Sequence, residues 1–324
     1  MCTAATYKTK DFYFGRTLDN EFSYEEEITV TPRNFPFRFR FTGEMKSHYA
    51  IIGMAHIADN YPLYYDALNE KGLCIAALNF VGNAHYFERK PNKDNVAHFE
   101  VILWLLGQCA SVSEVKDKLK KLNITNRAFS PELPKAELHW LIADRKESIT
   151  LESTKNGIFA YPNPVGVLTN NPPFEIQLFQ LNNYLNLSPE APQNKFSSHL
   201  NLKKYSNGMG AMGMPGDWSS QSRFVKASFV KMNSVCGTTE VESISQFFHI
   251  LESVAHPRGA VNMGNNIYEI TLYSSCCNVD RGIYYYKTYE NSQITGIRLH
   301  GVDLDSDQLF KFPLVKGQQI HMEN

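Results

Sequence analysis

The sequence predicts an α+β fold in which antiparallel sheets are covered by layers of helices. Three features of the 324-residue chain indicate this. Its strand-like segments come in neighbouring pairs joined by short polar turns, its helix-like segments also come in pairs, and strands do not alternate regularly with helices. A parallel sheet would require that alternation, because each parallel connection needs a crossover. Since no linker or repeat interrupts the pattern, we expect a single domain over residues 1–324.

Strands dominate the first 80 residues. Residues 2–7 and 11–18 flank a polar turn at 8–10 and predict a hairpin that brings Arg16 and Asp19 near the N-terminus. Later in the chain, apolar runs bounded by turn residues predict further strands. We expect strands at Glu27–Thr31, Tyr49–Ile57, Leu73–Phe80, Glu137–Ala143, Ser148–Ser153, Val165–Thr169, Ile267–Ser275 and Gly282–Thr288.

Helices are predicted between the strand pairs. The first pair is the apolar stretch 98–109 and a helix opened by the capping box Ser111–Glu114. The second pair covers 221–233 and 240–254, and the latter opens with a capping box at Thr239–Glu242. A further helix is expected at Phe174–Leu187, followed by a loop at 188–220. The expected inward-facing residues are Val115, Leu119 and Leu122 in the first pair, and Val241, Ile244, Phe248 and Leu251 in the second.

Composition excludes several classes of protein. A net charge of −1 gives no electrostatic footprint for nucleic acid. No basic-then-apolar leader is present, and no apolar run approaches the about 20 residues of a membrane span, so we expect a cytoplasmic protein without a membrane partner. Six cysteines without an export signal are expected to be reduced thiols, and their spacing does not suggest a metal site.

Motifs for bound cofactors are also unconvincing. Residues Gly208–Gly213 match GxGxxG, but they lie inside a loop rather than between a strand and a helix. We therefore expect no nucleotide and no other cofactor. His139 and His249 lie in apolar runs and are expected to be core residues rather than catalytic bases.

Cys2 is the residue that stands apart. Removal of Met1 would leave a chain that begins with a free α-amino group on a thiol-bearing residue, so that the mature chain starts at Cys2. An α-amino group has a pKa of about 7.7–8.0 and can accept a proton near neutrality, so one residue would supply both nucleophile and base. A cysteine at this position can also be incidental, and the assignment depends on its partners.

Four polar residues provide candidate partners. Arg16 and Asp19 would lie beside the N-terminus, where a guanidinium stabilises a thiolate and a carboxylate orients an amino group. The alternative is an ordinary surface ion pair. Asn79 and Asn170 both follow apolar strands, where asparagine serves either in turns or as a neutral donor to an oxyanion.

Together these residues resemble the choloylglycine hydrolase family of N-terminal nucleophile hydrolases, which includes bile salt hydrolases and penicillin V acylases. The matching segments occur in order along nearly the whole chain. They are Met1-Cys-Thr3, Phe14-Gly-Arg-Thr-Leu-Asp19, Asn69-Glu-Lys-Gly-Leu73, Leu78-Asn-Phe80, Leu138-His-Trp140, Gly166-Val-Leu-Thr-Asn170, Met214-Pro-Gly-Asp217, Ser222-Arg-Phe224 and Gly282-Ile-Tyr-Tyr-Tyr286.

The resemblance implies the fold and the catalytic roles. It implies a four-layer αββα sandwich, the N-terminal nucleophile hydrolase fold, and a homotetramer. It further implies that Cys2 is the nucleophile and its α-amino group the proton shuttle. Arg16 and Arg223 would form the thiolate environment, Asp19 would contact the amino terminus, and Asn79 and Asn170 would stabilise the oxyanion.

The resemblance also implies a substrate, a glycine- or taurine-conjugated bile acid that is hydrolysed at its amide bond. Asn79 favours this reading, since penicillin V acylases more often carry Tyr there. Thr17, Ser219-Ser220 and Ala58 depart from the family pattern, and Ala58 leaves the substrate preference open. A penicillin V acylase and a non-catalytic steroid-binding protein remain the alternatives. The expected pocket residues are Leu18, Ile57, Phe129, Leu133 and Leu138.

Overall fold

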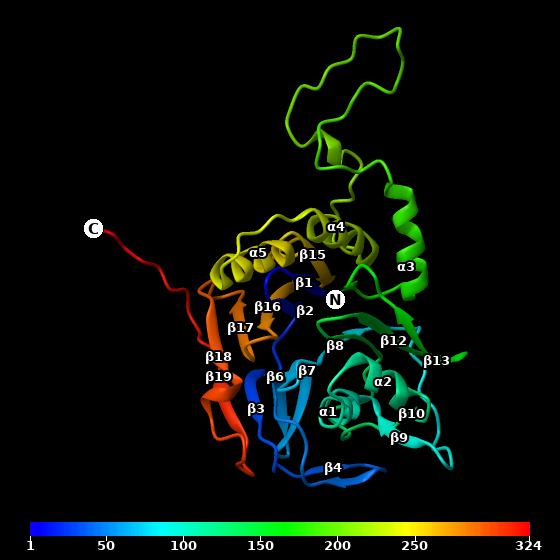
Figure 1. Ribbon diagram of the computed structural model, residues 1–324, viewed down its shortest axis with the longest axis vertical. Coiled ribbons are helices and arrows are strands. Elements are labelled where there is room, and N and C mark those ends of the chain that lie inside the picture. The colour runs from blue at the N-terminus through cyan, green and yellow to red at the C-terminus, as the bar shows by residue number, and fades with distance from the viewer.

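Two large antiparallel sheets stack face to face in the computed structural model of residues 1–324 (Figure 1). The first sheet has the order β14-β1-β2-β16-β17-β18, with β15 paired to β16, and the second has the order β13-β12-β11-β8-β7-β6-β3-β19. The first comprises β1 (Cys2–Lys8), β2 (Phe12–Asn20), β14 (Val167–Leu168), β15 (Val261–Gly264), β16 (Ile267–Asn278), β17 (Ile283–Thr288) and β18 (Thr295–Arg298). The second comprises β3 (Glu27–Thr31), β6 (Ile51–Ala58), β7 (Tyr61–Asn69), β8 (Cys74–Asn79), β11 (Leu138–Ala143), β12 (Ser148–Thr154), β13 (Gly157–Pro162) and β19 (Phe310–Pro313).

Helices cover the outer face of each sheet (Figure 1). Helices α4 (Ser220–Asn233) and α5 (Glu240–Glu252) lie on the first sheet, and α1 (Val101–Leu106) and α2 (Val112–Leu119) lie on the second. The predicted α+β architecture with four layers is therefore confirmed. The remaining elements are peripheral: α3 (Phe174–Gln180), the hairpin of β4 (Phe37–Phe39) and β5 (Gly43–Met45), and the parallel pair β9 (Asp94–Ala97) and β10 (Leu122–Thr125).

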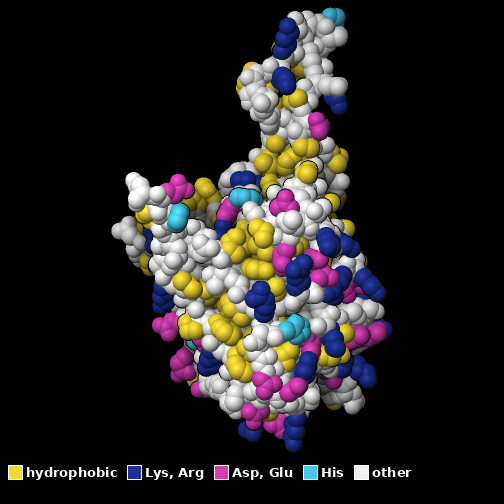
Figure 2. All heavy atoms as spheres, turned by 60° about the vertical axis from the view of Figure 1, so that its left-hand side comes forward, with side chains coloured by type: hydrophobic (Ala, Val, Ile, Leu, Met, Phe, Trp, Pro, Cys, Tyr) yellow, Lys and Arg dark blue, Asp and Glu magenta, His cyan; other side chains and the backbone are white.

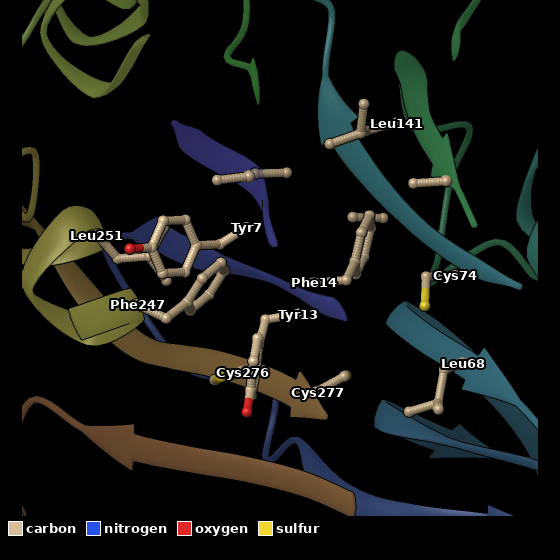
Figure 3. Packing of buried hydrophobic residues seen from close by; sticks show 14 of the residues in the cluster. Tyr7, Tyr13, Phe14, Leu68, Cys74, Leu141, Phe247, Leu251, Cys276 and Cys277 are labelled. Carbon is tan, nitrogen blue, oxygen red and sulfur yellow. The ribbon is translucent and has the colours of Figure 1, made fainter. Parts of the chain in front are cut away.

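Two apolar cores hold the layers together. The larger contains 39 buried residues between the two sheets and beneath α4 and α5, and the smaller contains 27 beneath α1 and α2. Figure 3 shows the alternation that builds the larger core: the side chains of Tyr13 and Phe14 leave β2 in opposite directions, and that of Phe14 is directed toward Leu141 of the second sheet. Central strands such as β1 are consequently buried on both faces.

The predicted N-terminal hairpin is confirmed. Strands β1 and β2 pair in antiparallel register with Cys2 opposite Leu18 and Ala4 opposite Arg16. Gly15 is required in this hairpin, because a Cβ there would overlap the backbone carbonyl of Ser275 on the neighbouring strand β16. The sequence thus brings the candidate nucleophile and its charged neighbours together by local pairing alone.

Helix prediction was correct in position and partly wrong in detail. The side chains of Ser111 and Thr239 cap α2 and α5 as expected. Leu122 belongs to β10 rather than to α2, and α3 ends at Gln180 instead of reaching Leu187. Val241 is 75% exposed, because the face of α5 that packs on the sheet is centred on Phe247. The ring of His249 is also exposed, where it pairs with Glu252 at 2.9 Å, whereas His139 is buried as expected.

An extended arm leaves the body between α3 and α4 (Figure 1). The chain between these two helices contains no strand and two short 3₁₀ helices, Leu181–Tyr184 and Met209–Ala211, and most of it is the predicted loop. None of the helices combines the length and the apolar character that a membrane span requires.

Candidate active site

A cavity of about 400 Å³ opens between β1 and β2 of the first sheet and β6, β7 and β8 of the second. Cys2 of β1 and Arg16, Leu18 and Asp19 of β2 lie on one side of it, and Asn79 lies at the end of β8 on the other. A loop at residues 126–137 forms a further wall. The cavity therefore contains the candidate nucleophile beside an apolar space.

Cys2 is almost fully buried, with 3% of its surface exposed, and polar groups hold its backbone. Its nitrogen donates to Asn170 Oδ1 at 2.8 Å, and its carbonyl oxygen accepts from Arg223 Nη1 at 2.5 Å. These contacts fix the residue in the cavity wall and place an amide oxygen next to the nitrogen that becomes the α-amino group once Met1 is removed.

Every polar atom of Asn170 takes part in a hydrogen bond. Its Oδ1 accepts from Cys2 N and from Arg223 Nη2 at 2.8 Å, which fixes the orientation of the amide because both neighbours are donors. Its Nδ2 donates to the carbonyl of Asn79 at 2.8 Å and retains one further hydrogen. Its backbone nitrogen donates to Ser220 Oγ at 2.8 Å. Asn170 therefore combines a fixed acceptor toward Cys2 with one spare donor.

The segment that carries Asn170 is itself anchored by buried side chains. Gln177 Nε2 donates to the Asn170 carbonyl at 2.5 Å, and His139 Nε2 lies 2.8 Å from the carbonyl of Thr169. The other ring nitrogen of His139 faces Glu152 Oε1 at 3.1 Å. His139, which sequence reasoning assigned only to the core, thus supports the site from beneath.

Arg223 links α4 to the nucleophile strand. It is 1% exposed, and besides Cys2 and Asn170 it donates to Thr3 Oγ1 at 2.6 Å and to the Trp218 carbonyl at 2.9 Å. Burial lowers the pKa of this guanidinium, and the nearby Asp19 and Cys2 oppose that effect. An arginine remains charged under these conditions, so a cation lies permanently behind Cys2.

Arg16 supplies a second buried cation. It is fully buried, donates to the carbonyls of Ala77, Tyr65 and Thr17, and leaves Nη2 without a partner in the protein. Burial by itself would lower its pKa, but the negative charges available at Cys2, Tyr273 and Asp66 raise the pKa overall. Arg16 therefore places a second positive charge beside the Cys2 side chain.

Asp66 belongs to the same charged layer. It lies between the sheets on β7 and accepts from the hydroxyls of Tyr273, Ser275 and Tyr284 at 2.7, 2.9 and 2.8 Å. Burial raises the pKa of this carboxyl, while Arg16 and the three hydroxyls oppose the rise.

Asp19 is buried in a network of hydroxyl donors. Its carboxylate accepts from Thr271 Oγ1 at 2.6 Å and from Thr17 Oγ1 at 3.1 Å, and it lies 3.9 Å from Arg223 Nη1. Its backbone carbonyl accepts from the Met1 α-amino group at 2.6 Å. That amino group also pairs with Glu269 at 2.8 Å. Arg16 and Asp19 are consequently not a surface ion pair.

The structure brings together all six polar site residues that the sequence singled out. Asn79 differs from the other five, since it is exposed at the rim of the cavity and contacts Asn170 through its backbone carbonyl rather than through its side chain. Four of the five predicted pocket residues line the cavity, namely Leu18, Phe129, Leu133 and Leu138. The prediction for Ile57 was wrong: it packs against the smaller core, while its neighbour His56 lines the cavity. Adjacent residues of a strand point to opposite faces.

Several site residues were not predicted. The hydroxyl of Thr17 accepts from Thr3 N at 3.1 Å and donates to Asp19, and the hydroxyl of Ser220 accepts from Asn170 N. Two residues that differ from the family pattern therefore form hydrogen bonds with the site. Tyr24, Tyr65 and Glu132 line the cavity but carried no signal in the sequence. No group of three or more His, Cys, Asp or Glu side chains in residues 1–324 is arranged to hold a metal ion.

Comparisons with known proteins agree with this geometry. Residues 2–312 match the family model for linear amide C–N hydrolases of the choloylglycine hydrolase family. The chain is 53% identical to a bile salt hydrolase/transferase from Lactiplantibacillus plantarum, with full coverage of both chains. It superposes on a crystal structure of conjugated bile acid hydrolase from Clostridium perfringens with a TM-score of 0.92 and 36% identity, again with both chains fully covered. A penicillin V acylase from Agrobacterium tumefaciens shares the fold, with a TM-score of 0.76 at 19% identity over 97% of this chain and 92% of its own.

Proposed function

The chain belongs to the choloylglycine hydrolase family of linear amide C–N hydrolases, and from that premise we propose that it hydrolyses glycine- or taurine-conjugated bile acids. The observation that carries the proposal is Cys2, held by Asn170 and Arg223 at the wall of a largely apolar cavity. Relatives with the names of bile salt and conjugated bile acid hydrolases match over the full chain.

Acylation begins with the Cys2 thiolate, which forms after its proton passes to the α-amino group. The sulfur attacks the amide carbon, and the carbon–sulfur bond forms while negative charge moves to the carbonyl oxygen. The spare Nδ2 hydrogen of Asn170 and the side chain of Asn79 are the candidate donors to this oxyanion. The carbon–nitrogen bond then breaks, and the α-amino group returns its proton to the leaving glycine or taurine.

Deacylation reverses the proton path. A water molecule attacks the thioester and gives a proton to the α-amino group, and the carbon–sulfur bond breaks to release the free bile acid. Asn170 Oδ1 accepts from the Cys2 nitrogen and keeps it beside the reacting bond. This mechanism requires removal of Met1, because a peptide nitrogen cannot shuttle a proton; the intact mass of the purified protein tests that step.

The deciding experiment compares amine release from glycocholate, taurocholate and penicillin V by the wild type and by Cys2→Ala. We expect release from the conjugated bile acids by the wild type only. Preferential release from penicillin V would favour the acylase alternative, for which the likeness to the Agrobacterium enzyme supports only a common fold. Binding of bile acid without any turnover in the wild type would favour the non-catalytic alternative.

Acyl transfer is a second candidate activity, since the Lactiplantibacillus relative has the name hydrolase/transferase. An amine could attack the thioester in place of water, with the amine proton passing to the α-amino group and the carbon–sulfur bond breaking. Incubation of cholate conjugates with an excess of a different amino acid, followed by mass spectrometry, would detect the exchanged conjugate. Only free cholate among the products would exclude the transfer.

We also propose that the chain forms a cytoplasmic homotetramer through the arm. The arm presents exposed apolar side chains, including Leu185, Phe196 and Tyr205, each more than 80% exposed, and Figure 2 shows apolar side chains gathered at its base. An isolated monomer rarely leaves such residues uncovered together. Light scattering of the wild type and of a Leu185→Ser, Phe196→Ser variant tests this assembly, and a monomeric wild type would refute it.

The six free thiols support the cytoplasmic location, because cysteines stay reduced in a reducing compartment, and cell fractionation tests it.

A further inference from the structure

A loop at residues 126–137 forms one wall of the catalytic cavity without any helix or strand of its own. Its C-terminal end is well anchored, because Ala136 N donates to His98 Nε2 at 3.1 Å and the Ala136 carbonyl accepts from the Tyr86 hydroxyl at 2.8 Å. The loop residues that line the cavity are Phe129, Glu132, Leu133, Pro134, Lys135 and Ala136. At the other end of the loop, Asn126 N donates to the Phe87 carbonyl at 3.3 Å, and Phe129, which lies between these anchors, needs an attachment of its own.

Arg40 provides that attachment. Its guanidinium carbon lies 5.1 Å from the ring centre of Phe129 and 5.7 Å from that of Phe99, and its Nη2 donates to the Phe129 carbonyl at 3.1 Å. The two rings meet edge to face at 5.3 Å, and the Tyr61 ring lies 5.8 Å from Phe129. A guanidinium at these distances attracts the faces of aromatic rings. One side chain therefore holds both the ring and the backbone of Phe129.

The same rings separate two cavities. Phe99 and Phe129 line the catalytic cavity and also a second cavity of about 420 Å³, whose other lining residues include Arg38, Arg40 and Asp307. The catalytic cavity is near the lower end of the range for ligand pockets, about 300–1,000 Å³. Displacement of Phe129 would join the two spaces and remove the wall against which an acyl group packs.

We propose that Arg40 is a positioning residue that fixes the Phe129 wall and thereby determines how tightly the acyl group is held beside Cys2. The assignment of that acyl group to a bile acid rests on the proposed function. Cys2, Asn170 and Arg223 are held by contacts that do not include the loop. Loss of the contacts between Arg40 and Phe129 therefore weakens substrate binding and leaves the chemical step unchanged.

The test is Arg40→Met, which removes the charge and the side-chain donor but keeps much of the length. The backbone bond from Arg40 N to Glu100 Oε1 at 2.7 Å does not depend on the side chain. We expect KM for glycocholate to rise about two- to five-fold, the change that loss of one exposed cation–π contact gives, with kcat unchanged. Arg38→Met is the matched control, since Arg38 lines the second cavity but its side chain is 84% exposed and pairs with Glu44.

A second measurement does not depend on activity. Arg127 and Lys135 are exposed trypsin sites of the loop. We expect cleavage at these two sites to be about two- to five-fold faster in Arg40→Met than in the wild type or Arg38→Met. Unchanged cleavage would show that Arg40 does not hold the loop. Faster cleavage with unchanged KM would refute the role of Arg40 in substrate binding. If the wild type did not hydrolyse glycocholate, the proposed function would fail. The cleavage comparison would still decide whether Arg40 holds the loop at Phe129.

Discussion

Acidification should destabilise the folded protein through His98. This ring is buried beside Phe99 and stacks on Tyr86, and burial, with a smaller contribution from the charge of Lys135, lowers its pKa to about 4. An exposed histidine in the unfolded chain has a pKa of about 6.5. Between these two values the unfolded chain binds one proton more than the folded protein, so the free energy of unfolding decreases as the pH falls from 6.5 to 4.

The magnitude follows from the gap between the two pKa values. At about 1.4 kcal/mol per pKa unit, the decrease attributable to His98 is at most about 3–4 kcal/mol, which is a large fraction of the stability of an ordinary domain. Protonation also removes the acceptor for Ala136 N, so the end of the cavity loop should loosen in the same pH range.

The assay is urea unfolding of the wild type and of His98→Gln at several pH values from 4 to 7.5, at one protein concentration. The glutamine oxygen can still accept from Ala136 N but does not titrate, so the wild type should lose about 3 kcal/mol relative to the variant on acidification. His321→Gln, in the exposed C-terminal tail, should follow the wild type at every pH. Parallel curves for the wild type and His98→Gln would refute the reasoning.

Three further outcomes are expected. Asn170→Ala should lower kcat for glycocholate by about 10²–10³-fold, because it removes the spare oxyanion donor and the acceptor for Cys2 N; a loss under tenfold in steady-state assays would exclude that role. Phe14→Ala should lower the free energy of unfolding by about 3–5 kcal/mol, since Phe14 is fully buried between the sheets, whereas Phe22→Ala, 47% exposed, should change it much less. Equal urea midpoints for these two variants would contradict the core assignment. Gly15→Ala should fail to fold, judged by circular dichroism, because its Cβ would overlap the Ser275 carbonyl; Gly216→Ala, whose Cβ would have open space, is the control.

Local patterns predicted the elements whose structure depends on short-range interactions. The β1–β2 hairpin needs only a polar turn between two apolar runs, and the capping side chains of Ser111 and Thr239 bond to nitrogens three residues ahead. Strand β7 was missed, because Tyr61–Asn69 contains a proline and an aspartate and forms a strand only through its pairing with β6 and β8. Leu122 shows the same effect, since it pairs with Asp94 of β9 instead of extending α2.

The amino-acid sequence was sufficient to predict the nucleophile strand, its charged neighbours Arg16 and Asp19, and, through the resemblance, the identity of the more distant site residues. These follow from a hairpin of some twenty residues and from motifs that can be recognised without coordinates. The meeting of Asn79, Asn170 and Arg223 around Cys2 depends on long-range packing, because these residues lie on separate elements that are brought together when both sheets and α4 pack. Long-range packing also determines which face of β6 lines the cavity and brings Arg40 against Phe129 of the cavity loop, because burial and side-chain direction depend on the layers that cover each strand.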